Sequence, residues 1–102
     1  PTTETSGAVT EPRFDADYLR NPPPTYPMIS RRFREEGKVV LRVFVNAEGQ
    51  PTQVDIKTSS TFQRLDQAAL QAVSQWRFVP ARRSNTPIGA WVLVPIVFNL
   101  NA

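Results

Sequence analysis

Residues 38–46 read KVVLRVFVN, and this stretch decides the fold. It is dense in β-branched residues and too short for a buried helix, so it predicts a strand. Successive side chains of a strand point to opposite faces. One face here is entirely apolar and comprises Val39, Leu41, Val43 and Val45. Because the opposite face includes Arg42, the strand is typical of a sheet that is covered on one side only.

A second strand follows in the same hairpin. Residues 46–51, NAEGQP, have the composition of a turn. Residues 53–58 then alternate between apolar and polar side chains, with Val54 and Ile56 on the apolar side. Two strands joined by a short loop that contains glycine predict an antiparallel hairpin.

A short helix is expected before this hairpin, over residues 28–36. Pro27 suits the first turn of a helix, and Gly37 is typical of a C-terminal stop. Ile29 and Phe33 are four residues apart, so we expect them to share the buried face of this helix.

The helix after the hairpin has the clearest periodic pattern. The hydroxyls of residues 59–61 are candidates for its N-cap, and the helix is expected to run to about Trp76 before Pro80 ends it. Apolar side chains recur along it at intervals of three and four: Leu65, Ala68, Ala69, Ala72, Val73 and Trp76. This stripe predicts the helix face that packs on the sheet.

Residues 91–100, WVLVPIVFNL, are apolar on both faces and predict the last strand. Pro95 lies inside it and cannot donate a hydrogen bond to a neighbouring strand, so the strand is expected at a sheet edge. Two interpretations stay open. Either a neighbouring segment covers the edge and Pro95 itself discourages aggregation, or the edge accepts an extended peptide by β-augmentation.

The element order α-β-β-α-β predicts an α+β fold, a two-layer sandwich with two helices packed on one face of a three-stranded antiparallel sheet. The 102 residues suffice for one such domain. We expect a flexible polar linker over residues 1–17, an extended proline-rich lead-in over residues 18–27 and the folded domain over residues 28–102. Any membrane anchor or targeting signal is expected upstream of Pro1.

The composition argues against an enzyme. The chain has no Cys and no His, which removes the thiolate nucleophile, the commonest metal ligands and the commonest general base. No catalytic residue, metal site or cofactor is predicted, and carboxylate chemistry through Asp55 and Asp66 lacks a motif. The net charge of +3 does not favour nucleic acid. The basic clusters are interpreted as solvated surface and comprise Arg31, Arg32, Arg34, Arg82 and Arg83.

Several short phrases together resemble the C-terminal domain of the TonB family. In chain order they are Tyr26-Pro27, Gly37-Lys38-Val39, Gly49, Ser59-Ser60, Leu65-Asp66-Gln67-Ala68-Ala69, Trp76-Arg77-Phe78-Val79-Pro80 and Val94-Pro95-Ile96-Val97-Phe98. The resemblance covers about residues 18–100, and the ordered set is specific although each phrase alone is weak. It implies the same two-helix, three-strand fold.

The resemblance also implies the function of a TonB energy transducer. Such proteins are anchored in the inner membrane by an N-terminal helix, which is absent from this fragment and expected upstream, and they act through that part with ExbB and ExbD. Their C-terminal domain lies in the periplasm. There it binds the Ton box, a peptide of an outer-membrane transporter, as a strand added beside the last strand. Force on the transporter then drives uptake of siderophores, haem or cobalamin.

Partner-binding residues follow from this resemblance and from the expected edge. On the last strand we expect contacts from Trp91, Val92, Val94, Ile96 and Phe98, or from their alternating neighbours. A second contact patch is expected in the lead-in from Arg20, Asn21, Pro23 and Tyr26, with Pro23 restricted to a backbone or packing contact. The arginines of the first helix are expected to meet acidic loops of the transporter.

Two alternatives remain beside the transducer. An envelope-spanning interaction domain of the TolA type would have a similar fold and no transporter partner. An open apolar edge would also permit homodimers by strand exchange.

Overall fold

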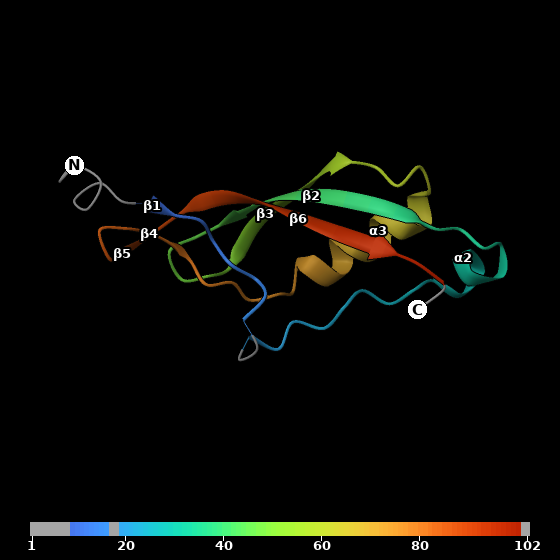
Figure 1. Cartoon of the computed structure of the whole chain (residues 1–102), viewed down its shortest axis with the longest axis horizontal. Coiled ribbons are helices and arrows are strands. Elements are labelled where there is room, and N and C mark those ends of the chain that lie inside the picture. The colour runs from blue at the N-terminus through green and yellow to red at the C-terminus, as the bar shows by residue number, and fades with distance from the viewer. Residues whose placement is uncertain (1–8, 17–18, 101–102) are drawn as a thin grey trace.

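The computed structural model of the chain describes residues 9–16 and 19–100. Its elements in chain order are β1 (Val9–Thr10), α2 (Met28–Arg32), β2 (Gly37–Val45), β3 (Pro51–Thr58), α3 (Gln63–Val73), β4 (Ala81–Arg83), β5 (Thr86–Ile88) and β6 (Ala90–Phe98). The α+β fold class is confirmed, with two helices and three long antiparallel strands in the expected order (Figure 1). A second, small sheet is added to them.

The main sheet has the strand order β3-β2-β6, with β2 in the centre. Strands β2 and β6 pair without interruption from Gly37↔Phe98 to Val45↔Ala90. The pairing of β2 with β3 contains two register irregularities. Strand β6 is therefore long, regular and at one edge of this sheet.

The hydrophobic core lies between α3 and one face of the main sheet. The predicted inner face of β2 is fully buried, as are Leu65, Ala69 and Val73 of α3. The inner face of β6 completes the core with Val92, Val94, Ile96 and Phe98. Within residues 9–16 and 19–100, neither helix combines the length and apolar character needed to cross a membrane.

Helix α2 differs from its prediction. It ends at Arg32 and lies at one end of the molecule, whereas the small sheet lies at the other end (Figure 1). Ile29 is 49% exposed and Phe33 is 70% exposed, so these side chains do not share a buried face. Only Ser30 of this helix is buried, because a helix this short and this far along the sheet has little core to cover.

The N-terminus of α3 also differs from its prediction. Phe62 occupies the N-cap position and makes no side-chain cap bond. The hydroxyls of Ser59 and Ser60 donate instead to the carboxylate of Asp66, one turn into the helix. Trp76 lies beyond the C-terminal end of α3 but is still buried in the core.

The small sheet has the strand order β1-β4-β5. Strands β4 and β5 form a hairpin that the sequence did not predict, and the residues at its turn, Ser84 and Asn85, have φ of 51° and 70°. Two consecutive positive φ values are those of a type I′ turn. Strand β1 pairs with β4, and Phe14 stacks on Trp76 with ring centroids 5.9 Å apart. Residues 9–16 thus contact the domain, while the predicted division at residue 17 falls on a residue outside the described part.

The position of Gly49 in the β2–β3 turn can be occupied only by a residue without a side chain. Its φ is +83°, and a Cβ at this position would lie 2.2 Å from the carbonyl oxygen of Phe78. The N–H of Phe78 donates to the carbonyl of Gly49 at 2.9 Å. This close approach joins the hairpin turn to the segment that follows α3.

Candidate functional site

One side of β6 has no strand partner among the described residues, because β6 is the last strand of the main sheet. The direction of its backbone groups follows from the β2–β3 hairpin. The N–H of Asn46 donates to the carbonyl of Gln50 at 2.9 Å and therefore points toward β3. Backbone groups alternate in direction along a strand, so Val45 and every second residue back to Val39 point toward β6.

Because β2 and β6 pair without a register shift, the direction of the backbone groups on β6 follows from that on β2. Ala90, Val92, Val94 and Ile96 pair with the residues of β2 that point toward β6. Their neighbours form the non-hydrogen-bonded pairs and direct their backbone groups away from the sheet. We call these neighbours the open edge, and they are Trp91, Leu93, Pro95 and Val97.

The side chains of β6 follow the same alternation. Trp91 is 42% exposed, Leu93 is 47% exposed and Val97 is 66% exposed, all on the face opposite α3. The predicted contact residues Val92, Val94, Ile96 and Phe98 belong instead to the core. Their side chains cannot reach a partner because they are buried on the inner face of the sheet. Of the predicted β6 residues, Trp91 alone presents its side chain outward.

An apolar shelf lies beside one half of the open edge and consists of Phe44, Trp91 and Leu93. The rings of Phe44 and Trp91 meet edge to face, with centroids 5.2 Å apart. The Arg42 guanidinium lies 4.2 Å from the centroid of the Trp91 ring and forms an ion pair with Asp55 at 3.7 Å. These contacts restrain the Trp91 ring while leaving part of it exposed.

Asn21 fastens the lead-in to the segment after α3. Its side-chain amide donates to the carbonyls of Phe14 (3.1 Å) and Arg77 (2.7 Å), and its Oδ1 accepts from the N–H of Arg77 (2.7 Å). One residue later, the carbonyl of Pro22 accepts from the indole N–H of Trp76 at 2.7 Å. The side chain of Asn21 is thus used inside the domain rather than presented to a partner.

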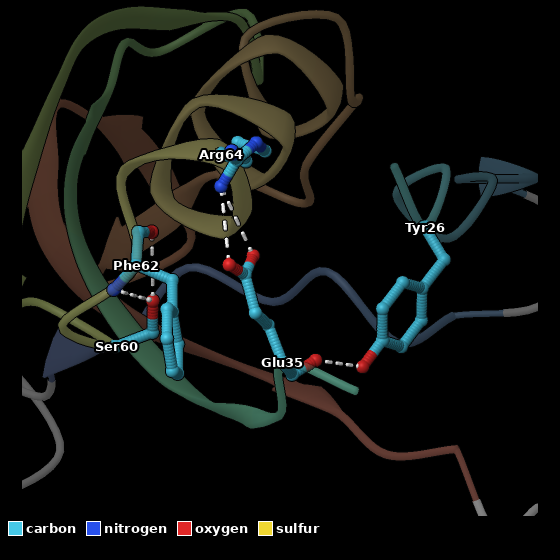
Figure 2. A network of polar contacts seen from close by, with 5 residues as sticks. All are labelled: Tyr26, Glu35, Ser60, Phe62 and Arg64. Carbon is cyan, nitrogen blue, oxygen red and sulfur yellow. Dashed lines mark hydrogen bonds and ion pairs between the residues drawn. The ribbon is translucent and has the colours of Figure 1, made fainter. Parts of the chain in front are cut away.

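Tyr26 joins the lead-in to the segment that follows α2 and to the core. Its ring meets Phe98 edge to face at 5.3 Å, and its hydroxyl donates to the carbonyl of Glu35 (Figure 2). The Glu35 carboxylate in turn pairs with Arg64 of α3 at 3.1 Å. Partial burial, reinforced by the nearby Glu36 carboxylate, raises the pKa of the Tyr26 hydroxyl. Tyr26 therefore stays protonated at neutral pH and can keep donating this hydrogen bond.

The remaining predicted residues of the lead-in, Arg20 and Pro23, are exposed. Arg20 has a positive φ of 54°. The lead-in and α3 border an open groove of about 520 Å³, whose lining includes Pro23, Thr25, Gln67 and Gln71. The four predicted lead-in residues therefore divide into two groups, since Asn21 and Tyr26 hold the segment in place and Arg20 and Pro23 face solvent.

Asp66 is the most strongly restrained carboxylate of the described residues. Burial alone would raise its pKa, but hydrogen bonds from the Ser59 hydroxyl and from the N–H and hydroxyl of Ser60 outweigh burial and lower it. Ser60 also accepts from the N–H of Phe62 at 3.1 Å (Figure 2). This cluster fixes the start of α3. Among residues 9–16 and 19–100, no three Asp or Glu side chains gather as they would around a metal ion.

Residues 22–100 match the family described as Gram-negative bacterial TonB protein C-terminal. The chain belongs to this TonB family. Over 90 residues, or 88% of the chain, it is 48% identical to protein tonB2 of Pseudomonas aeruginosa, and over 77 residues it is 35% identical to protein TonB of Vibrio cholerae. The chain spans about a third of the length of these relatives, 33% and 32% respectively.

Solved TonB C-terminal domains have the same fold. The solution structure from Pseudomonas aeruginosa aligns with a TM-score of 0.69 over 92% of this chain and 88% of that domain, at 23% identity. A structure from Helicobacter pylori aligns with a TM-score of 0.59 over 78% of this chain and 83% of its own, also at 23% identity. At this identity the likeness supports the fold, and the TonB assignment rests on the sequence matches.

The sequence indicated Leu93 and Val97 only as the alternating neighbours of the named β6 residues, and it gave no sign of the Arg42–Trp91 contact. The alternation along β6 was visible, but both of its faces are apolar, so the outward face could not be chosen without the register to β2. The internal role of Asn21 had no sequence signal, because two of its three hydrogen bonds are to Arg77, 56 residues away.

Proposed function

We propose that this TonB domain binds the Ton box of an outer-membrane transporter by β-strand addition at the open edge of β6. The observation that carries the proposal is the row of backbone groups on β6 that no strand of the described residues pairs with. An extended peptide can form main-chain hydrogen bonds there, while the apolar shelf supplies side-chain contact.

The lead-in supports a second part of the same proposal. Asn21 and Tyr26 fasten it to the domain, so load applied from the N-terminal side enters a segment held by specific contacts. We propose that Arg20 and Pro23 meet the transporter beside the Ton box. The exposed side chains Arg31, Arg32 and Arg34 would meet its acidic loops, an attraction that salt would partly screen.

The complete transducer is part of the proposal as well. An upstream helix would anchor it in the inner membrane, ExbB and ExbD would couple that helix to the proton gradient, and this domain would work in the periplasm. The transported ligand would be a siderophore, haem or cobalamin. Membership of the TonB family supports these statements.

Two other outcomes use the same edge. In a TolA-type interaction domain, β6 would have a different partner and would ignore a Ton box. In a homodimer, β6 would pair with a second copy of the chain, because an unpaired apolar edge favours strand exchange.

Titration of the isotope-labelled domain with a synthetic Ton-box peptide tests the proposal by NMR. We expect saturable shifts of backbone amides in β6. If no amide shifts at about 1 mM peptide, a concentration at which even very weak binding is detected, the proposal is contradicted and the TolA type is favoured. Analytical sedimentation at the same protein concentration shows whether the domain is a monomer or a homodimer. A homodimer paired through β6 would compete with the peptide for the same edge.

A further inference from the structure

Pro95 interrupts the open edge of β6. Trp91, Leu93 and Val97 each present one N–H and one carbonyl to this edge, whereas Pro95 presents a carbonyl alone because its nitrogen has no hydrogen. The Cδ methylene of its ring occupies the place where the hydrogen would be. A strand added along β6 would therefore meet a donor at every outward residue except Pro95.

The missing donor affects an added peptide whichever way the peptide runs. One peptide carbonyl opposite Pro95 obtains no N–H partner. It meets the Cδ hydrogens instead, and C–H···O contacts hold the carbon and oxygen about 3.3–3.6 Å apart, against about 2.9 Å for N–H···O bonds. The peptide backbone is thus pushed away from β6 at this residue.

The two sides of Pro95 offer a peptide very different surfaces. On the side toward Ala90, Trp91 and Leu93 supply two donors and pair with Phe44 and Arg42 of β2. Phe44 completes the apolar shelf with them, and the Arg42 guanidinium lies over the Trp91 ring. On the other side Val97 supplies one donor. Val97 pairs with Lys38 of β2, and β6 ends at the residue after Val97.

We infer that Pro95 ends strand addition and confines the docked peptide to the half of β6 from Ala90 to Val94. The inference rests on the proposed function, since it specifies the peptide that the open edge takes. The ligand is a short extended segment with an apolar side chain over the Trp91 ring, and its chain turns away from the sheet at Pro95. Pro95 is then a specificity residue that sets the length of the bound segment.

Amide hydrogen exchange with saturating Ton-box peptide tests this footprint. In the unmodified domain, the amides of Trp91 and Leu93 are expected to exchange more slowly with peptide bound, while the amide of Val97 keeps its rate. In Pro95→Ala the protection is expected to extend through residue 95 to Val97. Nuclear Overhauser contacts between residue 95 and Val40 verify that the β2–β6 register is retained in the variant.

Affinity supplies a second readout. For a peptide of about ten residues, which exceeds the nine residues of β6, Pro95→Ala is expected to bind more tightly by at least about 2- to 12-fold, the range for one added hydrogen bond, because the N–H of residue 95 and that of Val97 both become available. For a peptide of about five residues, which covers only the shelf side, the affinity should not change. Pro87→Ala in β5 is the matched control, because it removes a proline from a strand that is not part of the open edge.

The possible failures are distinguishable. Equal protection of Val97 and Leu93 in the unmodified domain would overturn the inference while leaving strand addition intact. So would a Pro95→Ala variant with the same footprint and the same affinity for both peptides. If no β6 amide responds to peptide in any variant, the proposed function fails, and the inference fails with it.

Discussion

Asn21→Ala tests whether the lead-in is a structural part of the domain. The substitution removes three hydrogen bonds, to the carbonyl of Phe14 and to both backbone groups of Arg77. A neutral hydrogen bond contributes about 1 kcal/mol net, and water can replace some of these bonds because Arg77 is exposed. We therefore expect the free energy of unfolding to fall by about 2 kcal/mol. For a domain of about 100 residues this lowers Tm by about 8–16 °C.

Thermal unfolding followed by circular dichroism measures this change. The indole N–H of Trp76, bonded to the carbonyl of Pro22, should also exchange faster with solvent in the variant. Gln71→Ala on the exposed face of α3 is the control, with Tm expected within about 2 °C of the unmodified domain. If Asn21→Ala unfolds at the same temperature as this control, the lead-in is not fastened as described.

Three further predictions concern stability. Because hydrogen bonds hold the folded-state pKa of Asp66 below its ordinary value near 3.8, its contribution is complete above that value and is lost as the pH falls through the lowered pKa. Asp66→Asn should therefore cost about 2 kcal/mol at pH 7 and progressively less below pH 4 in urea titrations, and a pH-independent difference would contradict this. Gly49→Ala should cost about 3 kcal/mol or more in urea unfolding, because it combines a positive φ with a clash against Phe78, and Gly37→Ala should cost less. Ser30→Ala should raise Tm by about 4–8 °C in calorimetry, because the buried Ser30 hydroxyl has no hydrogen-bond partner within residues 9–16 and 19–100, and a lower Tm would show that this hydroxyl is satisfied.

The main sheet could be predicted because its signals are local. Alternation in residues 38–46 identified the buried face of β2, and Pro95 indicated that β6 lies at an edge. The β4–β5 hairpin was missed because its turn is Ser84-Asn85, without the glycine that usually marks a type I′ turn. The packing of Phe14 was missed because an isolated aromatic residue reveals nothing about a partner as distant as Trp76.

The sequence predicted the strand that forms the candidate site but did not show which of its side chains are exposed. Both faces of β6 are apolar, so periodicity located the element without telling which side chains point outward. That choice depends on Val94 pairing with Leu41, a contact between segments far apart in the chain. The internal use of Asn21 depends in the same way on the path of the lead-in, which no local pattern encodes.

The orientation of β6 has a mechanical consequence. This strand runs along the long dimension of the molecule, and the lead-in extends in the same general direction on its way to α2 (Figure 1). Tension carried by the lead-in and resisted by a peptide docked on β6 would act nearly parallel to both segments. The hydrogen bonds between β6 and the peptide would then be loaded together in shear and not broken one at a time. A few bonds loaded in shear could resist a force that would break the same number of bonds pulled perpendicular to the strands.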